Sequence, residues 1–182
     1  MLLRPAAAAA IASLLSLGVT ALARADTSTG TGTITAGVLS EAASPAFAFS
    51  ATLTGADQTA AYTLPITVTD ARGTGAGWNL TITSTAWSTG TDSLPTTASS
   101  ITGVAAACVT GVTCTNPTNS VGYPVSVPAG TLPPTAVKFF NAAANTGMGQ
   151  FTVTPTVSVT IPGTAKQGVY ASTVTLAAVS GP

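Results

Sequence analysis

The sequence predicts an all-β protein, an antiparallel two-layer β-sandwich with Greek-key-like connections. Apolar and hydroxyl residues alternate with a period of two in segment after segment, which is typical of antiparallel sheets with one face in water. Turn sequences rich in glycine and proline separate these segments, and no stretch shows a convincing helical period. Threonine, a β-branched residue suited to pleated surfaces, occurs 34 times in residues 26–182. A chain of this length is expected to fold as one domain.

The first 25 residues have the pattern of a secretory signal peptide. Arg4 precedes an apolar run over residues 6–22, and the small-residue sequence Ala23-Arg24-Ala25 follows it. This arrangement places the cleavage site between Ala25 and Asp26. The run is shorter than the roughly 20 residues that cross a bilayer, which argues against an uncleaved membrane anchor. We therefore expect a secreted mature chain, residues 26–182, that forms a single β-sandwich domain and is free of the membrane after cleavage.

The first three strands are expected at residues 31–39, 47–54 and 61–70. In the third, isoleucine and valine at positions 66 and 68 alternate with threonine. A turn sequence at residues 54–57, which contains glycine and aspartate, separates the second strand from the third.

The middle of the chain is expected to hold four strands, at residues 78–85, 98–107, 121–127 and 136–141. The first of them places Trp78, Leu80 and Ile82 on one face of the sheet. Turn sequences lie at residues 73–77, 89–92 and 128–130.

The last two strands are expected at residues 150–161 and 169–179, where valine and threonine alternate most regularly. A turn containing proline and glycine at residues 161–163 separates them. Between residues 141 and 149 we expect a helical turn.

The composition excludes most catalytic and nucleic-acid-binding proteins. The chain has no histidine, and only 5% of its residues are charged. The mature chain keeps three basic and five acidic residues, a net charge of −2: Arg72, Lys138, Lys166, Asp26, Glu41, Asp57, Asp70 and Asp92. So few groups cannot supply the usual general bases and metal ligands, nor can they neutralise a row of phosphates. We expect no catalytic residue, no metal, no cofactor and no nucleic-acid partner.

The two cysteines, Cys108 and Cys114, enclose five residues around a central glycine. In an exported protein, such a pair is most simply a local disulfide. A redox pair usually has the tighter Cys-x-x-Cys spacing, and a metal site would need further ligands nearby.

The glycine-rich sequence at residues 73–77 is interpreted as a hairpin connection. A phosphate-binding loop would open a helix, but here a predicted strand follows directly. Asp70 and Arg72 stand beside this connection, and as a surface ion pair they would contribute less than ~1 kcal/mol.

Two parts of the sequence carry a family resemblance. The stretch Pro65-Ile-Thr-Val-Thr-Asp-Ala-Arg-Gly-Thr-Gly-Ala-Gly-Trp-Asn-Leu-Thr-Ile82 joins an aspartate, a glycine turn and a Gly-Trp-x-Leu motif, and closing strands follow at residues 152–162 and 168–176. In this order, these pieces resemble the WxL-domain cell-surface protein family. The resemblance makes Trp78, Asn79 and Leu80 the family motif and the candidate wall-binding residues. The second motif lacks its tryptophan, because Val174-Thr175-Leu176-Ala177 stands in the matching place.

The resemblance implies a secreted, non-enzymatic cell-surface protein that associates non-covalently with the bacterial cell wall, with peptidoglycan as partner and other surface proteins as further partners. The alternative from a different class is a structural subunit of a surface filament or adhesive layer, in which threonine-rich sheets associate edge to edge.

The two tryptophans receive different expectations. Trp78 shares a strand face with two aliphatic residues, which favours a place in the core over stacking on a sugar. Trp87 is followed by serine, threonine and glycine, and it is the residue that we expect to be a partly exposed aromatic.

Overall fold

A computed structural model describes residues 26–182, and this part of the chain contains ten β-strands and no helix. The strands are β1 (Leu39–Ala43), β2 (Gln58–Thr63), β3 (Ile66–Asp70), β4 (Trp78–Thr85), β5 (Ser99–Cys108), β6 (Val125–Ser126), β7 (Ala129–Gly130), β8 (Val137–Ala142), β9 (Gly149–Ile161) and β10 (Val174–Ser180). Nothing between residues 26 and 182 forms a helix that could span a membrane. The predicted signal peptide and its Ala25 cleavage position lie outside the described residues.

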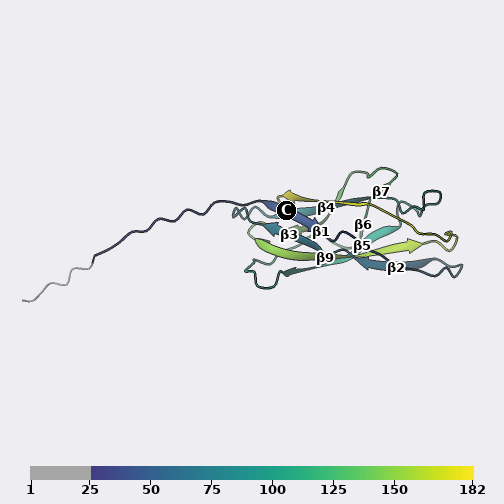
Figure 1. The fold of residues 1–182 in the computed structure, drawn as a ribbon, viewed down its shortest axis with the longest axis horizontal. Helices are drawn as coiled ribbons and strands as arrows, with labels where there is room; N and C mark the ends of the chain where they lie inside the picture. Colours follow the sequence, from purple (N-terminus) through teal and green to yellow (C-terminus); the bar gives the residue numbers. More distant parts are fainter. Residues whose placement is uncertain (1–25) are drawn as a thin grey trace, which may run out of the picture. The chain divides into compact units, whose positions relative to one another are not determined.

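The strands of residues 35–182 form two sheets (Figure 1). The first has the order β1-β3-β9-β5-β6, with β2 also paired to β9, and the second has the order β10-β4-β7, with β8 also paired to β4. Every pairing is antiparallel except that of β4 with β7. The predicted all-β, two-layer sandwich is confirmed. Residues 26–34, which fall into a separate unit, contain no strand.

Strand β9 organises the first sheet. Along one of its edges β3 and β2 pair with it one after the other, and along the other edge it pairs with β5. The sequence predicts a single strand at residues 61–70, but the structure divides it into β2 and β3 at Leu64 and Pro65. Proline has no backbone N–H to give to the ladder, so the strand breaks there.

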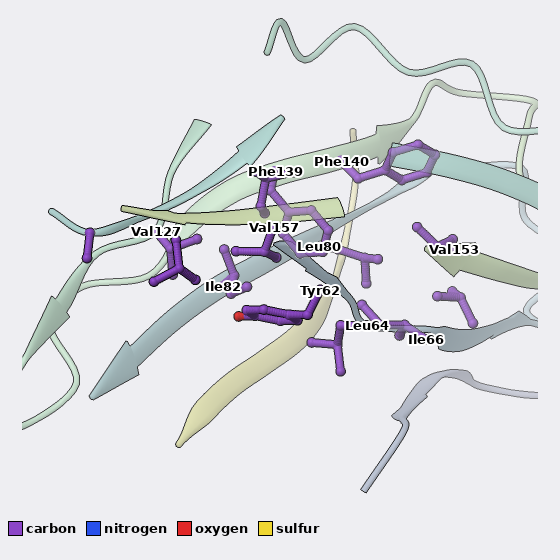
Figure 2. Close-up of a cluster of buried hydrophobic side chains, with 14 of the residues drawn as sticks. Tyr62, Leu64, Ile66, Leu80, Ile82, Val127, Phe139, Phe140, Val153 and Val157 are labelled. Carbon is purple, nitrogen blue, oxygen red and sulfur yellow. The ribbon is translucent and has the colours of Figure 1, made fainter. Parts of the chain in front are cut away.

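The core lies between the two sheets. Figure 2 shows Leu80 and Ile82 of β4, Phe139 of β8 and Val153 and Val157 of β9 converging in one layer. All five of these side chains are almost fully buried. In β4 and β9 these are inward-facing positions that alternate with polar residues, so the period-two pattern of the sequence selects them. In β8 a register shift against β4 buries the neighbouring Phe140 as well as Phe139.

The other strand predictions have mixed outcomes. Strand β4 has the predicted bounds, and β5, β8 and β9 each differ by one residue at one or both ends. The strand expected at residues 121–127 is reduced to β6, and the one expected at 169–179 begins only at Val174. Residues 141–149 hold a turn with Asn145 and Gly147 at positive φ instead of a helical turn, and β7 was not predicted.

Two expected strands are absent from the described structure. Residues 31–36 make no backbone hydrogen bond to another described residue, and Gly37 and Val38 only prolong the β1–β3 pairing through Ala71. Residues 47–54 belong to neither sheet. Pro45 stands where β1 would have to continue into the second of these segments. Its missing N–H ends the pairing with the neighbouring strand.

The disulfide between Cys108 and Cys114 is present, as predicted. It closes a short loop that begins at the end of β5 and packs on the start of β9, where a Cβ on Gly149 would lie 2.9 Å from the Cβ of Cys114.

Removing this bridge should leave the fold intact. Closing so small a loop constrains the unfolded chain by about 2 kcal/mol, which is far less than the burial of the core provides. We expect a protein with Cys108→Ala and Cys114→Ala to keep its β-sheet circular dichroism and to unfold at a slightly lower denaturant concentration. Loss of the β-sheet spectrum in this variant would contradict the expectation.

Candidate functional site

The Trp-x-Leu motif lies at the start of β4, inside the core. The Trp78 side chain is 0% exposed, and its Nε1 donates a hydrogen bond to the Gly147 carbonyl oxygen at 2.7 Å. Its ring centroid lies 5.8 Å from that of Phe140 and 6.3 Å from that of Phe151. Leu80 is equally buried. These two side chains therefore hold the sheets together and are inaccessible to a wall polymer in the folded chain.

Glycine at position 147 is required by this arrangement. Its φ is +69°, and a Cβ there would lie 2.7 Å from the Trp78 Nε1 atom, closer than real contacts allow. The third motif residue, Asn79, is only partly buried, and its Nδ2 donates to the Gly181 carbonyl oxygen at 2.8 Å. Asn79 thus ties the end of the chain beyond β10 to β4.

A buried ion pair closes the loop ahead of the motif. Arg72 contacts Asp70 through two hydrogen bonds, Nε to Oδ1 and Nη2 to Oδ2, both at 2.8 Å, and its Nη2 also donates to the Gly77 carbonyl oxygen at 2.8 Å. Its Nη1 donates to the Ser180 hydroxyl of β10. We call these contacts the Arg72 clamp. The Asp70 side chain is 2% exposed and the Arg72 side chain 16%, so the prediction of a surface pair is wrong.

The Arg72 guanidinium lowers the pKa of the Asp70 carboxyl below its usual value, through its side-chain hydrogen bonds and its charge. Asp70 in turn raises the pKa of Arg72. The sequence places the two residues beside a glycine turn, but nothing in the sequence indicates that β10 covers them.

Trp87 is buried as well, so the prediction of a partly exposed aromatic is wrong. Its side chain is 8% exposed, and its Nε1 donates to the Ser99 hydroxyl at 3.0 Å. Phe47 and Phe49 pack against it edge to face, with centroid distances of 6.0 and 4.9 Å. Phe47 also stacks on Tyr62 at 4.5 Å, and burial raises the pKa of that tyrosine to about 12.

Trp87 forms part of the floor of a depression of about 690 Å³ that we call the aromatic groove. Its walls are residues 47–51, Leu53 and residues 165–170, and Leu94 and Ile161 complete the floor. Lys166, on one wall, pairs with Asp92 at 2.8 Å, and this contact lowers the pKa of Asp92. The groove is therefore mainly apolar, and the one cation that lines it is already paired.

A second depression, of about 330 Å³, has a different chemistry, and we call it the hydroxyl hollow. It lies where the end of β4 runs between β7 and residues 171–173. Its lining holds no charged and no aromatic side chain: Thr85, Ala86, Ser88, Ser93, Gly130, Thr131, Ala171, Ser172 and Thr173. The hydroxyls of Ser93, Thr131 and Thr173 are exposed and have no hydrogen-bond partner in the described structure.

Sequence reasoning missed the hydroxyl hollow. Serine and threonine occur throughout the chain, so no local signal distinguishes the few that gather there. Neither depression brings carboxylates together, and no group of three or more metal-ligating side chains occurs within residues 26–182. Both surfaces are suited to binding: the aromatic groove through its aromatic side chains, and the hydroxyl hollow through its serine and threonine hydroxyls.

Comparison with known proteins places the chain in a family. A family model described as WxL domain surface cell wall-binding matches residues 24–179, a range that holds β1 to β9 and nearly all of β10. The comparison with curated proteins gave no match, and neither did the comparison with solved structures. Because the family model covers most of the chain, this protein belongs to the WxL domain family of surface cell wall-binding proteins.

Proposed function

We propose that the mature chain is a secreted, non-enzymatic domain that associates non-covalently with the peptidoglycan of the cell wall. The observation that carries this proposal is the family match over residues 24–179, which includes the whole sandwich apart from the last residue of β10. The near absence of ionisable groups supports a binding role over a catalytic one.

The hydroxyl hollow is the surface that we assign to the glycan. Trp78 and Leu80 are buried, and Trp87 is nearly so, which leaves no freely exposed tryptophan in residues 26–182 for a sugar to stack on. Ser93, Thr131 and Thr173 present unengaged hydroxyls in one place, and such groups both donate to and accept from sugar hydroxyls. A contact of this kind is weak by itself, but a repeating wall polymer offers many copies of it.

Binding to wall material should persist in high salt. No charged side chain lines the hydroxyl hollow, so there is no ion pair at the contact for salt to screen. The measurement is sedimentation of the mature chain with insoluble peptidoglycan, stripped of other polymers, at low and at high salt concentration.

The variant for this experiment carries Thr131→Val and Thr173→Val, which remove two hydroxyls and keep the side-chain shape. We expect about tenfold weaker sedimentation with peptidoglycan, since each lost hydrogen bond contributes about 0.5–1.5 kcal/mol. Thr160→Val, at an exposed position of β9 outside the hollow, is the matched control and should bind like the wild type. Binding that disappears in high salt, or that survives the double substitution, would contradict the assignment of the hollow.

The alternative role as a filament subunit makes a different prediction. Open-ended assembly in the absence of any wall material, together with failure to sediment with peptidoglycan, would favour it.

A further inference from the structure

Residues 47–54 form a strand-like segment without a partner strand. The sequence predicts a strand here, and the structure keeps the alternation, because Phe47 and Phe49 are half-buried while Ala48 and Ser50 are exposed. Yet no backbone N–H or C=O of residues 47–54 has a hydrogen-bond partner among the described residues. A segment with strand-like alternation and a free backbone is a template for pairing with another chain.

The two faces of this segment differ in chemistry. The odd positions are all apolar and line the aromatic groove: Phe47, Phe49, Ala51 and Leu53. The even positions 48, 50 and 52 carry alanine, serine and threonine, and the first two of them also border the groove. Only the first half of the apolar face is covered in one molecule, by Tyr62 and Trp87, whereas Leu53 at the other end is 40% exposed.

The segment also lacks the features that keep edge strands apart. No charged residue stands between Glu41 and Asp57, and no proline lies within residues 47–54. Lysines, prolines and inward-pointing charges are the usual protection of an exposed edge. This edge is therefore open to a neutral strand of alternating apolar and small residues, which is a description of the segment itself.

We propose that a second copy of this chain pairs with the first through residues 47–53, antiparallel and about a two-fold axis at Ser50. In this register Phe47 lies opposite Leu53 of the other copy and Phe49 opposite Ala51, so that each large ring meets a smaller side chain. The exposed leucine of each molecule gains an aromatic neighbour, and the small even residues face one another. A two-fold contact of this kind uses the same surface twice and closes at two subunits.

The register is tested by a cysteine placed on the axis. In the mature chain with its native disulfide intact, Ser50→Cys should give a covalent dimer on mild oxidation, seen on a gel run without reductant. Ala48→Cys is the matched control, because in this register position 48 faces position 52 of the other copy and lies too far from its own equivalent to cross-link. Equal cross-linking of both variants, or of neither, would overturn the register.

The interface itself is tested by association in solution, with no wall material present, so the result does not depend on the proposed function. Sedimentation of the wild type should show a reversible monomer–dimer equilibrium that stops at two subunits. Ala48→Pro, which removes one backbone donor from each copy, should shift the midpoint to concentrations about tenfold higher. The control for Ala48→Pro is Ala46→Pro, because Ala46 lies outside the paired residues. Ala106→Pro would not serve as a control, because Ala106 belongs to the β5 ladder.

A wild type that stays monomeric at every concentration would refute the proposal. So would a dimer that Ala48→Pro leaves unchanged, since it must then use another edge, or an assembly that grows beyond two subunits. If pairing is confirmed while sedimentation with peptidoglycan fails, the dimer stands and the wall-binding proposal falls.

Discussion

Replacing Trp78 by alanine should lower the free energy of unfolding by about 3–5 kcal/mol, the range for removing a large aromatic side chain from a core. The indole is 0% exposed, lies beside Phe140 and Phe151, and gives its only N–H to Gly147. The substitution removes all of these contacts and leaves a buried carbonyl without its donor. Denaturant unfolding followed by circular dichroism measures the loss, and a loss of this size is a large part of the stability of a domain.

Two further variants separate the contributions of this residue. Trp78→Phe keeps a ring but removes the hydrogen bond to Gly147, so we expect a smaller loss of about 1–3 kcal/mol plus the effect of the smaller ring. Val179→Ala, at a partly exposed position of β10, should change stability by no more than about 0.5 kcal/mol. If Trp78→Ala instead melted like the wild type but failed to sediment with peptidoglycan, the motif would be a direct wall contact and the structural role would be wrong.

Breaking the Arg72 clamp is expected to have the second-largest effect. Arg72→Ala leaves the Asp70 carboxylate, which is 2% exposed, without its counter-charge and without two hydrogen bonds. Removing one partner of a buried pair destabilises by about 3 kcal/mol, because the remaining charge stays desolvated. It also frees the Gly77 carbonyl and the Ser180 hydroxyl, so the turn and β10 lose a common support.

The stability loss in Arg72→Ala should depend on pH, whereas a loss of packing alone should not. In the wild type the pKa of Asp70 is lower in the folded chain than in the unfolded one, so the pair stabilises fully above the unfolded pKa of about 3.9. That stability is lost as the pH falls through the lower, folded pKa. In Arg72→Ala the guanidinium and its hydrogen bonds are gone, so burial, which raises the pKa of Asp70, is opposed only by the backbone N–H of residue 72. Acidification should therefore reduce the difference between variant and wild type.

Arg72→Lys is the matched control for charge. It keeps the cation but cannot form the paired hydrogen bonds, so it should recover part of the stability and keep the direction of the pH dependence. Asp92→Asn controls for the exposed ion pair with Lys166, and we expect little change from it. An Arg72→Ala protein that loses stability with acid as steeply as the wild type would show that Asp70 is not the titrating group.

Several strands could be predicted from the sequence because their local pattern and their place in the fold agree. In β4 and β9 every inward-facing residue from Trp78 to Ile82 and from Phe151 to Ile161 is apolar, and each strand pairs on both sides. The disulfide and the core position of Trp78 follow from spacing and from alternation in the same way. These are local features, and the sequence contains them directly.

Other features depend on residues that are distant in the chain. Trp87 stands among small polar residues, which indicates exposure, but Phe47 and Phe49 come from forty residues away to cover it. Arg72 is partly buried and bonds Ser180 at the end of β10, and residues 47–54 have a strand pattern that lacks a partner within one molecule. Periodicity reports which face of a segment is apolar, but it does not report what lies against that face.

The order of the strands bears on the secretion that we propose. The central strand of the second sheet, β4, pairs with β10, and the central strand of the first sheet, β9, pairs with β2, β3 and β5, all of which are synthesised before it. Neither sheet can be completed until β9 and β10 have been synthesised, and such long-range pairing forms slowly. During synthesis the early strands therefore lack their partners, and under the proposed secretion the polypeptide would remain unfolded enough to pass through a translocation channel until its final strands are available on the far side.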